Sequence, residues 1–457
     1  MDKKQLYYKV ILDSQSQKNK IQFIVENDLA NQTKMDEDKF ENFILDKYAI
    51  SKQQINTANI SFSNFKQYSH FLFTKIKNLV YNNKLQLNVK KLFLEVKFCY
   101  LYQDDAHYLD DLLSTFQQDL ELLSLNLIGN YLSLYGLSQI LKSISRLFPK
   151  LNRLIIDFSV NSSAHLHKVD IKKFDGFHDI IKLNSLKSID LNLNQAVEFS
   201  NFFECLKNPQ SFPSNLKEIF INCQQLEYGQ SKSNFFENFS FIFERLPQLE
   251  YLDLNFTSSY TSGILTFLNA LKNSRLQKFV LDLYKGKLNE TPSQIMNTIF
   301  QSQYLKYLDI NFRMAANNST DCLEVFQNLH KCTNLEILKV SLKNNDIENL
   351  QLITFADHLS KTPTNLSQVN LDLTNDYKQK RLSQEYINHL EFQILQIPNL
   401  THASISFTET NAEKHSQRLK QYSQQAKALI QQNIAFKKLI GPFMVFNPTF
   451  ISQDLFF

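Results

Sequence analysis

The sequence predicts an α/β fold in which one strand–helix unit repeats along the chain to form a solenoid. Three observations support this prediction: an apolar pattern that recurs about every 31 residues, helical spacing between its copies, and prolines at the joints. Strand–helix units that repeat in one direction build a parallel sheet with right-handed crossovers and place all helices on one face. We therefore expect a horseshoe of about 11–12 repeats, with the sheet on the concave face and the helices on the convex face.

Each expected strand is marked by four apolar residues, a first one and then others three, five and seven positions later. Leu249, Leu252, Leu254 and Phe256 form the clearest copy. Such alternation indicates a strand with one buried face. The pattern begins at twelve residues, 27 to 35 positions apart: Ile55, Val89, Leu120, Leu151, Leu186, Leu216, Leu249, Leu276, Leu305, Leu335, Leu366 and Leu400.

The segments between the strands have the spacing of amphipathic helices. After the strand at Leu249, an apolar stripe continues through Ile264, Leu265, Leu268 and Leu271. Each unit is therefore expected to add one helix of three to four turns. Proline ends a helix and directs the chain into the next strand. Five of the nine prolines stand two or three residues before the first residue of a repeat: Pro149, Pro213, Pro247, Pro363 and Pro398.

The segment from Leu246 to Leu254, with the sequence LPQLEYLDL, resembles the leucine-rich-repeat family. The repeat length and the helical half resemble its ribonuclease-inhibitor-like subclass, and the resemblance covers residues 55 to 408. The family usually carries Asn or Cys eight positions after the first residue of the repeat, and here only Asn194 is an Asn at that position. We therefore expect the internal side-chain ladder to be largely missing and the strands to run two residues further.

The two ends of the chain are expected to close the array, because the terminal cores of a solenoid would otherwise be open to water. We assign residues 1–54 to an N-terminal cap, residues 55–408 to the solenoid and residues 409–457 to a C-terminal capping helix with an aromatic tail. Residues 7–12 and 21–25 are candidates for a strand pair in the N-terminal cap. The C-terminal segment has an alternative role as a docking tail for a partner.

Composition and motifs exclude several classes of protein. The net charge of +4 gives no global case for nucleic-acid binding. The five cysteines are odd in number and widely spaced, which favours free thiols in a reducing compartment. A signal peptide and a membrane-length apolar run are not evident, so we expect an intracellular, cytoplasmic protein. Phosphate-binding, dinucleotide-binding and nucleophile-elbow motifs are also missing, so we expect no enzyme and no cofactor.

Two groups of metal-type side chains have incomplete ligand sets. His165 and His167 form one pair in a predicted loop. The second group lies at a predicted helix start, where the helix dipole accounts for acidic residues. It consists of Asp104, Asp105, His107, Asp110 and Asp111. We therefore expect no metal site.

The strand residues that alternate with the apolar ones are expected to face solvent on the concave side. We place Asp157, Asp190, Asp253 and Asp309 in a central row, four residues after the first residue of each repeat. The end row, six residues after it, holds Asn192, Asn222, Asn255, Asp282 and Asn311. Aromatic residues dominate interface energies, and Phe220, Tyr251, Tyr284 and Tyr307 interrupt these rows as candidate anchors. The alternative is that the polar residues are ordinary soluble residues of an exposed sheet.

The favoured hypothesis is a scaffold or adaptor that binds a protein partner on the concave face. A second hypothesis, which the family resemblance implies, is the recognition subunit of a regulatory complex of the GTPase-activating or ubiquitin-ligase substrate-receptor type. A third is RNA binding through a basic C-terminal helix, with an affinity that falls steeply with salt. The plainer interpretation of that helix is a solvated face of the cap. Its basic residues are Lys414, Arg418, Lys420 and Lys427.

Overall fold

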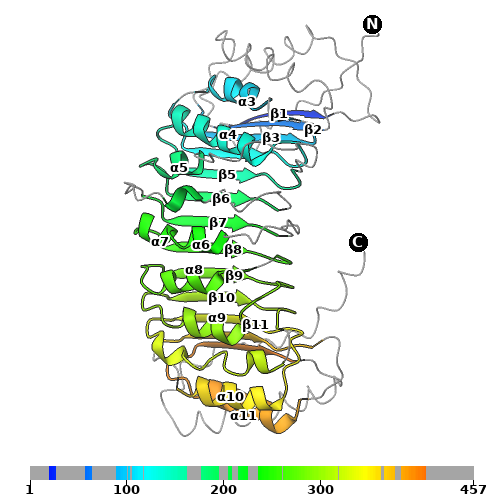
Figure 1. Cartoon of the computed structure of the whole chain (residues 1–457), viewed down its shortest axis with the longest axis vertical. Helices are drawn as coiled ribbons and strands as arrows, with labels where there is room; N and C mark the ends of the chain where they lie inside the picture. Colours follow the sequence, from blue (N-terminus) through cyan, green and yellow to red (C-terminus); the bar gives the residue numbers. More distant parts are fainter. Residues whose placement is uncertain are drawn as a thin grey trace. The chain divides into compact units, whose positions relative to one another are not determined.

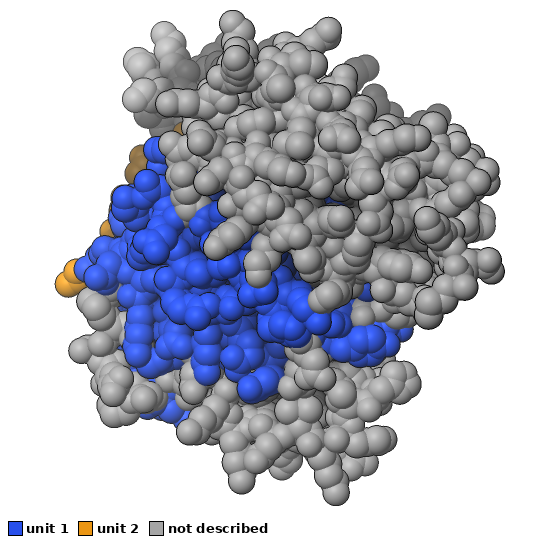
Figure 2. All heavy atoms as spheres, turned by 90° about the horizontal axis from the view of Figure 1, so that it is seen from above, with its two compact units in different colours: residues 1–255 blue, residues 256–457 orange. Residues whose placement is uncertain are grey.

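A computed structural model describes most of the predicted repeat array. The described residues are 20–26, 57–63, 89–99, 101–102, 105–116, 118–161, 176–194, 204–207, 215–224, 235–259, 261–316, 319–361, 365–375 and 382–407. The chain divides into two compact units, a first unit of residues 1–255 and a second unit of residues 256–457 (Figure 2).

The first unit contains eight described strands that pair in chain order, each parallel to its neighbours. They are β1 (Lys20–Glu26), β2 (Thr57–Ser63), β3 (Lys91–Lys97), β4 (Leu122–Asn126), β5 (Arg153–Asp157), β6 (Ser188–Asn192), β7 (Glu218–Asn222) and β8 (Tyr251–Asn255). The strand expected at residues 21–25 is present as β1, and Ile21 lies opposite Ala58 of β2. Its expected partner at residues 7–12 lies outside the described residues.

The second unit contains five described strands with the same parallel, sequential pairing. They are β9 (Lys278–Asp282), β10 (Tyr307–Asn311), β11 (Ile337–Ser341), β12 (Gln368–Asp372) and β13 (His402–Ser406). In both units each strand meets the next at the same position of the repeat, as Leu308 meets Leu338. Parallel strands that alternate with helices in this way fit a repeat solenoid.

Helices cover one face of the sheet in each unit (Figure 1). In the first unit they are α3 (Ala106–Leu113), α4 (Leu134–Leu147), α5 (Gly176–Ile181), the 3-10 helix η3 (Glu204–Lys207), α6 (Phe235–Phe239) and α7 (Ile242–Arg245). In the second unit they are α8 (Ile264–Leu271), α9 (Pro292–Ile299), the 3-10 helices η4 (Ser319–Cys322) and η5 (Leu329–Lys331), α10 (Asn349–Leu359) and α11 (Gln384–Leu395).

The prolines end helices as the sequence predicts. α4 ends two residues before Pro149, α7 ends two residues before Pro247, and α11 ends three residues before Pro398. Pro213 and Pro363 lie outside the described residues.

The prediction of three to four helical turns in every repeat holds for α4, α10 and α11 but is wrong for several others. α3, α8 and α9 have only eight residues each, about two turns, and residues 319–331 form no α-helix. This segment forms 3-10 turns, in which the amide of Val325 donates to the carbonyl of Cys322 at 3.3 Å. Its apolar residues Cys322, Val325, Phe326 and Leu329 are nevertheless all buried. Both kinds of helix bury a stripe with this spacing, so the apolar pattern alone does not distinguish them.

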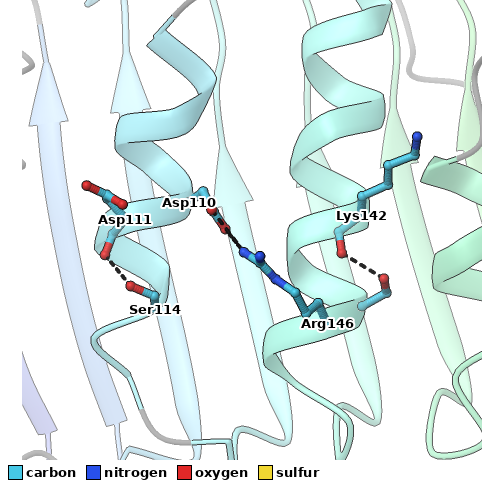
Figure 3. Close-up of polar contacts among 6 residues, drawn as sticks. Asp110, Asp111, Ser114, Lys142 and Arg146 are labelled. Carbon is cyan, nitrogen blue, oxygen red and sulfur yellow. Dashed lines mark hydrogen bonds and ion pairs between the residues drawn. The ribbon is translucent and has the colours of Figure 1, made fainter.

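An exposed ion pair joins two neighbouring helices of the first unit. The Arg146 guanidinium on α4 donates to both carboxylate oxygens of Asp110 on α3, at 2.8 and 3.0 Å (Figure 3). Asp110 and Asp111 lie in the second half of α3, so the helix dipole proposed from the sequence does not account for them. These carboxylates instead contact other groups of the chain. Arg146 pairs with Asp110, and Tyr102 donates its backbone amide to the side chain of Asp105 at 2.7 Å.

Buried asparagines bond the turns that follow the strands. The side-chain amide of Asn130 donates to the carbonyls of Val96 and Leu127 at 2.7 and 2.8 Å. Its oxygen accepts from the amides of Cys99 and Leu101 at 3.0 and 3.3 Å. Such bonds satisfy backbone groups that the turn would otherwise leave buried without partners.

Asn161 and Asn345 form similar hydrogen bonds in later repeats. All three lie ten positions after the first residue of their repeat, two positions beyond the family's usual place. The ladder is therefore lost only in part, because in other described repeats the same position holds Cys99, Ser259, Gly286 and Ala315. The apolar pattern extends to the seventh position, and the turn with its ladder residue is displaced by the same two residues.

A left-handed residue precedes the ladder position in seven of the described repeats. Its amide donates to a carbonyl of the next turn, as Val160 donates to Asn194 and Lys285 to Arg313, both at 2.9 Å. Left-handed backbone suits glycine, which occurs here once, at Gly129 with φ +67°. The other residues are Phe98, Val160, Ser258, Lys285, Met314 and Asn344, with φ from 52° to 61°.

Candidate functional site

The strand side chains that point away from the helices form what we call the open face of each sheet. In most strands the third and fifth positions of the repeat are buried, while the second, fourth and sixth are half-buried. This confirms the alternation predicted from the sequence. The register corrects one assignment: Asp157 lies opposite Asn192 and belongs to the end row, whereas Ile155 lies opposite Asp190 in the central row.

The end row has a structural role that the sequence analysis did not recognise. Its side-chain oxygens accept the backbone amide two residues ahead, which forms an Asx turn where the strand ends. Asp282 accepts from Tyr284 at 2.9 Å and Asn311 from Arg313 at 3.0 Å. The same bond is made by Asp157, Asn192 and Asn222, at 3.1 to 3.3 Å. An Asx residue at the last strand position of successive repeats was the available signal.

The open face of the first unit holds an aromatic pair flanked by carboxylates. The rings of Phe220 and Tyr251 meet edge to face, with centroids 4.8 Å apart. The Tyr251 hydroxyl donates to Asp253 at 3.2 Å. Across the strands, Phe220 lies between Asp190 and Asp253 in the central row. We call these four residues, Asp190, Phe220, Tyr251 and Asp253, the aromatic–acidic cluster.

Asp190 is the unusual member of this cluster. Burial raises the pKa of its carboxyl group and Asp157 adds to the rise, while Arg153 opposes it. Asp190 makes no hydrogen bond or ion pair among the described residues. The hydroxyl of Ser188, two residues earlier on the same strand, is buried and has no hydrogen-bond partner among the described residues. A partly desolvated carboxylate on an otherwise accessible face is typical of a binding site.

The second unit repeats the Tyr–Leu–Asp sequence with different neighbours. The Tyr307 hydroxyl donates to Asp309 at 3.0 Å. The ammonium groups of Lys278 and Lys339 lie 4.9 and 5.2 Å from the Tyr307 ring centroid. Lys339 also pairs with Asp309 at 3.7 Å. Here the chain's own lysines contact the aromatic and acidic groups that the sequence analysis predicted to bind a partner.

Tyr284 lies beyond the end of its strand, beside two cations. The Arg313 guanidinium carbon is 4.8 Å from the ring centroid, and the Lys285 ammonium is 5.1 Å from it. The sequence analysis identified Tyr284 but neither cation. Both could have been found by aligning the positions that follow neighbouring strands.

Metal binding and thiol chemistry have little support among the described side chains. They include no group of three or more residues suited to hold a metal ion. His165, His167 and Asp104 lie outside the described residues. Four cysteines of the described part are buried thiols outside any disulfide: Cys99, Cys223, Cys322 and Cys332. Burial raises the pKa of Cys322 and of Cys332 to about 12, so these thiols are poor nucleophiles.

Two further predictions from the sequence concern the C-terminal segment and the membrane. The basic residues of the predicted C-terminal helix (Lys414, Arg418, Lys420 and Lys427) lie outside the described residues. Among the helices that are described, none has the length and apolar character that crossing a bilayer requires.

No protein-family model matches the chain, and a search of curated proteins finds no match.

Proposed function

We propose that the chain is a leucine-rich-repeat protein of the ribonuclease-inhibitor-like kind that acts as a non-enzymatic, cytoplasmic scaffold or adaptor. It binds a partner protein on the open face of the first unit, through the aromatic–acidic cluster. The observation that carries the proposal is the placement of Phe220 between two carboxylates, one of which, Asp190, is partly desolvated and forms no hydrogen bond or ion pair with a described residue.

The family assignment is supported by the repeat itself. Repeats of about 31 residues each contribute one parallel strand, and buried asparagines such as Asn130 and Asn161 bond successive turns. These asparagines stand two positions later than is usual in the family, after a correspondingly longer apolar pattern.

The cluster favours a basic partner segment. A Lys or Arg side chain placed against Phe220 would pack on the ring and could form an ion pair with Asp190. Aromatic side chains at the centre of a patch, surrounded by half-buried polar groups, are the usual anchors of protein interfaces. Because Asp190 has no hydrogen bond to any described residue, a partner need not displace one of those bonds to reach it.

Affinity purification from the native cell, with the full chain and its variants, tests this proposal. Asp190→Lys reverses the charge on the open face, and Glu237→Lys makes the same change at an exposed position of α6 in the helix layer. We expect proteins retained by the wild-type chain to be lost with Asp190→Lys and kept with Glu237→Lys, with or without nuclease. Loss with Glu237→Lys alone would place the interface on the helices, and loss with nuclease alone would favour RNA.

A further inference from the structure

A cationic cluster lies where the strands of two neighbouring repeats in the second unit end. β9 and β10 each end in an Asx turn, and the residues that follow are Tyr284 and Lys285 in one repeat and Arg313 in the next. The backbone amide of Lys285 donates to the carbonyl of Arg313 at 2.9 Å, so the two turns are held side by side. Lys285 has φ +52°, and this left-handed conformation turns the chain immediately after Tyr284.

Both cations contact one aromatic ring. The Arg313 guanidinium carbon and the Lys285 ammonium lie 4.8 and 5.1 Å from the centroid of Tyr284. Cation–π contact fixes the position of each charge but does not neutralise it. Two like charges beside one ring repel each other, so the arrangement is stabilised further when an anion joins them.

The chain supplies no counter-charge to this pair within its described part. Neither Lys285 nor Arg313 forms an ion pair there, and the Nε atom of Arg313 is buried without a hydrogen-bond partner. The Asp282 carboxylate, two residues before Tyr284, accepts the Tyr284 backbone amide at 2.9 Å. Lys339 on the same sheet differs, because it is paired with Asp309 at 3.7 Å.

We infer that Tyr284, Lys285 and Arg313 form a binding site for a phosphomonoester carried by a partner polypeptide. A phosphomonoester has a charge of about −1.5 to −2 at neutral pH, which matches two cations better than a single carboxylate does. The planar guanidinium presents paired donors to phosphate oxygens, and its contact with the tyrosine limits the side-chain entropy lost on binding. A nucleobase is a poorer ligand, because the ring that it would stack on already contacts two cations.

Titration of the full chain with N-acetyl-phosphoserine amide, followed by the phosphorus resonance of the ligand, tests the site. We expect saturable broadening with the wild-type chain and an affinity at least about tenfold weaker for Arg313→Gln and for Lys285→Gln, since each removes one charge-assisted contact. Arg313→Lys should retain part of the affinity, because it keeps the charge and loses the paired donors. Lys339→Gln is the matched control and should bind as the wild type does.

Several outcomes would overturn the inference. One is a lack of saturable broadening with the wild-type chain, and another is an unchanged affinity in both glutamine variants. An equal loss with Lys339→Gln would show non-specific attraction to a basic surface. Equal affinity for N-acetyl-glutamate amide would assign the cluster to acidic segments instead of phosphomonoesters. Thermal unfolding of each variant verifies that it is folded, and because the cluster lies in the second unit, failure here leaves the proposed interface of the first unit untouched.

Discussion

Replacement of the ladder residue Asn130 by alanine should destabilise the first unit far more than the few atoms it removes would suggest. Asn130 is 1% exposed, and its amide bonds backbone groups of its own repeat and of the preceding one. Asn130→Ala removes all of these bonds and leaves a space that its neighbours cannot fill without moving the turn.

The expected magnitude follows from the backbone groups that lose a partner. The carbonyl of Leu127 keeps a hydrogen bond in this variant, because Asn161 also donates to it, at 2.9 Å. Three groups lose their bond to Asn130: the carbonyl of Val96 and the amides of Cys99 and Leu101. A buried polar group without a partner costs about 1–3 kcal/mol. Allowing for partial entry of water, we expect a loss of about 3–4 kcal/mol, at the upper end of single-site effects.

Urea unfolding of the full chain, followed by circular dichroism, measures this loss. Asn126→Ala is the matched control, because Asn126 is half-buried and accepts a single bond from Ile128 at 3.3 Å; it should cost less than about 1 kcal/mol. Hydrogen exchange of the Cys99 and Leu101 amides should accelerate in Asn130→Ala and stay slow in the control. A loss no larger than that of Asn126→Ala would refute the ladder as a source of stability.

Three further predictions follow. Val160→Gly should stabilise the chain by about 0.5–1 kcal/mol in the same unfolding assay, because a β-branched residue is strained at φ +57°. Gly129→Ala should destabilise the chain, since a Cβ at this position would meet the Phe98 ring. A Gly129→Ala variant more stable than the wild type would contradict the argument. Asp190→Asn should be more stable than the wild type at neutral pH and should bind the partner less well. The pKa of Asp190 is raised in the folded state, so its ionisation disfavours folding above that pKa. The stability advantage of Asn should fade as the pH falls through the folded-state pKa and vanish below the unfolded pKa of about 3.9. An advantage independent of pH would exclude this carboxyl group as the cause. Cys322 and Cys332, with a pKa of about 12, should react with a thiol reagent at neutral pH only after urea unfolds the chain, and rapid labelling of the native protein would show that they are accessible.

The repeat, the strands and their buried face could all be predicted from the sequence. These features depend on local periodicity: alternating apolar residues such as Leu252 and Leu254 select a strand with one face in the core, and prolines such as Pro247 end the preceding helix. The position of the ladder could be found from the folded chain alone, because Asn130 is identified by bonds to a turn about 30 residues earlier. The folded chain also decided the type of helix at residues 319–331, where α and 3-10 turns bury the same stripe.

The candidate sites depended on tertiary structure for the same reason. Tyr251 and Tyr307 stand in nearly identical sequences, yet Tyr251 meets Phe220 while Tyr307 meets two lysines. The neighbours of each tyrosine come from strands about 30 residues away, and parallel register places them side by side. A pattern confined to one strand fixes which way a side chain points; the charge and the aromatic ring that it meets are set by the next strand, and that pairing decides what each surface can bind.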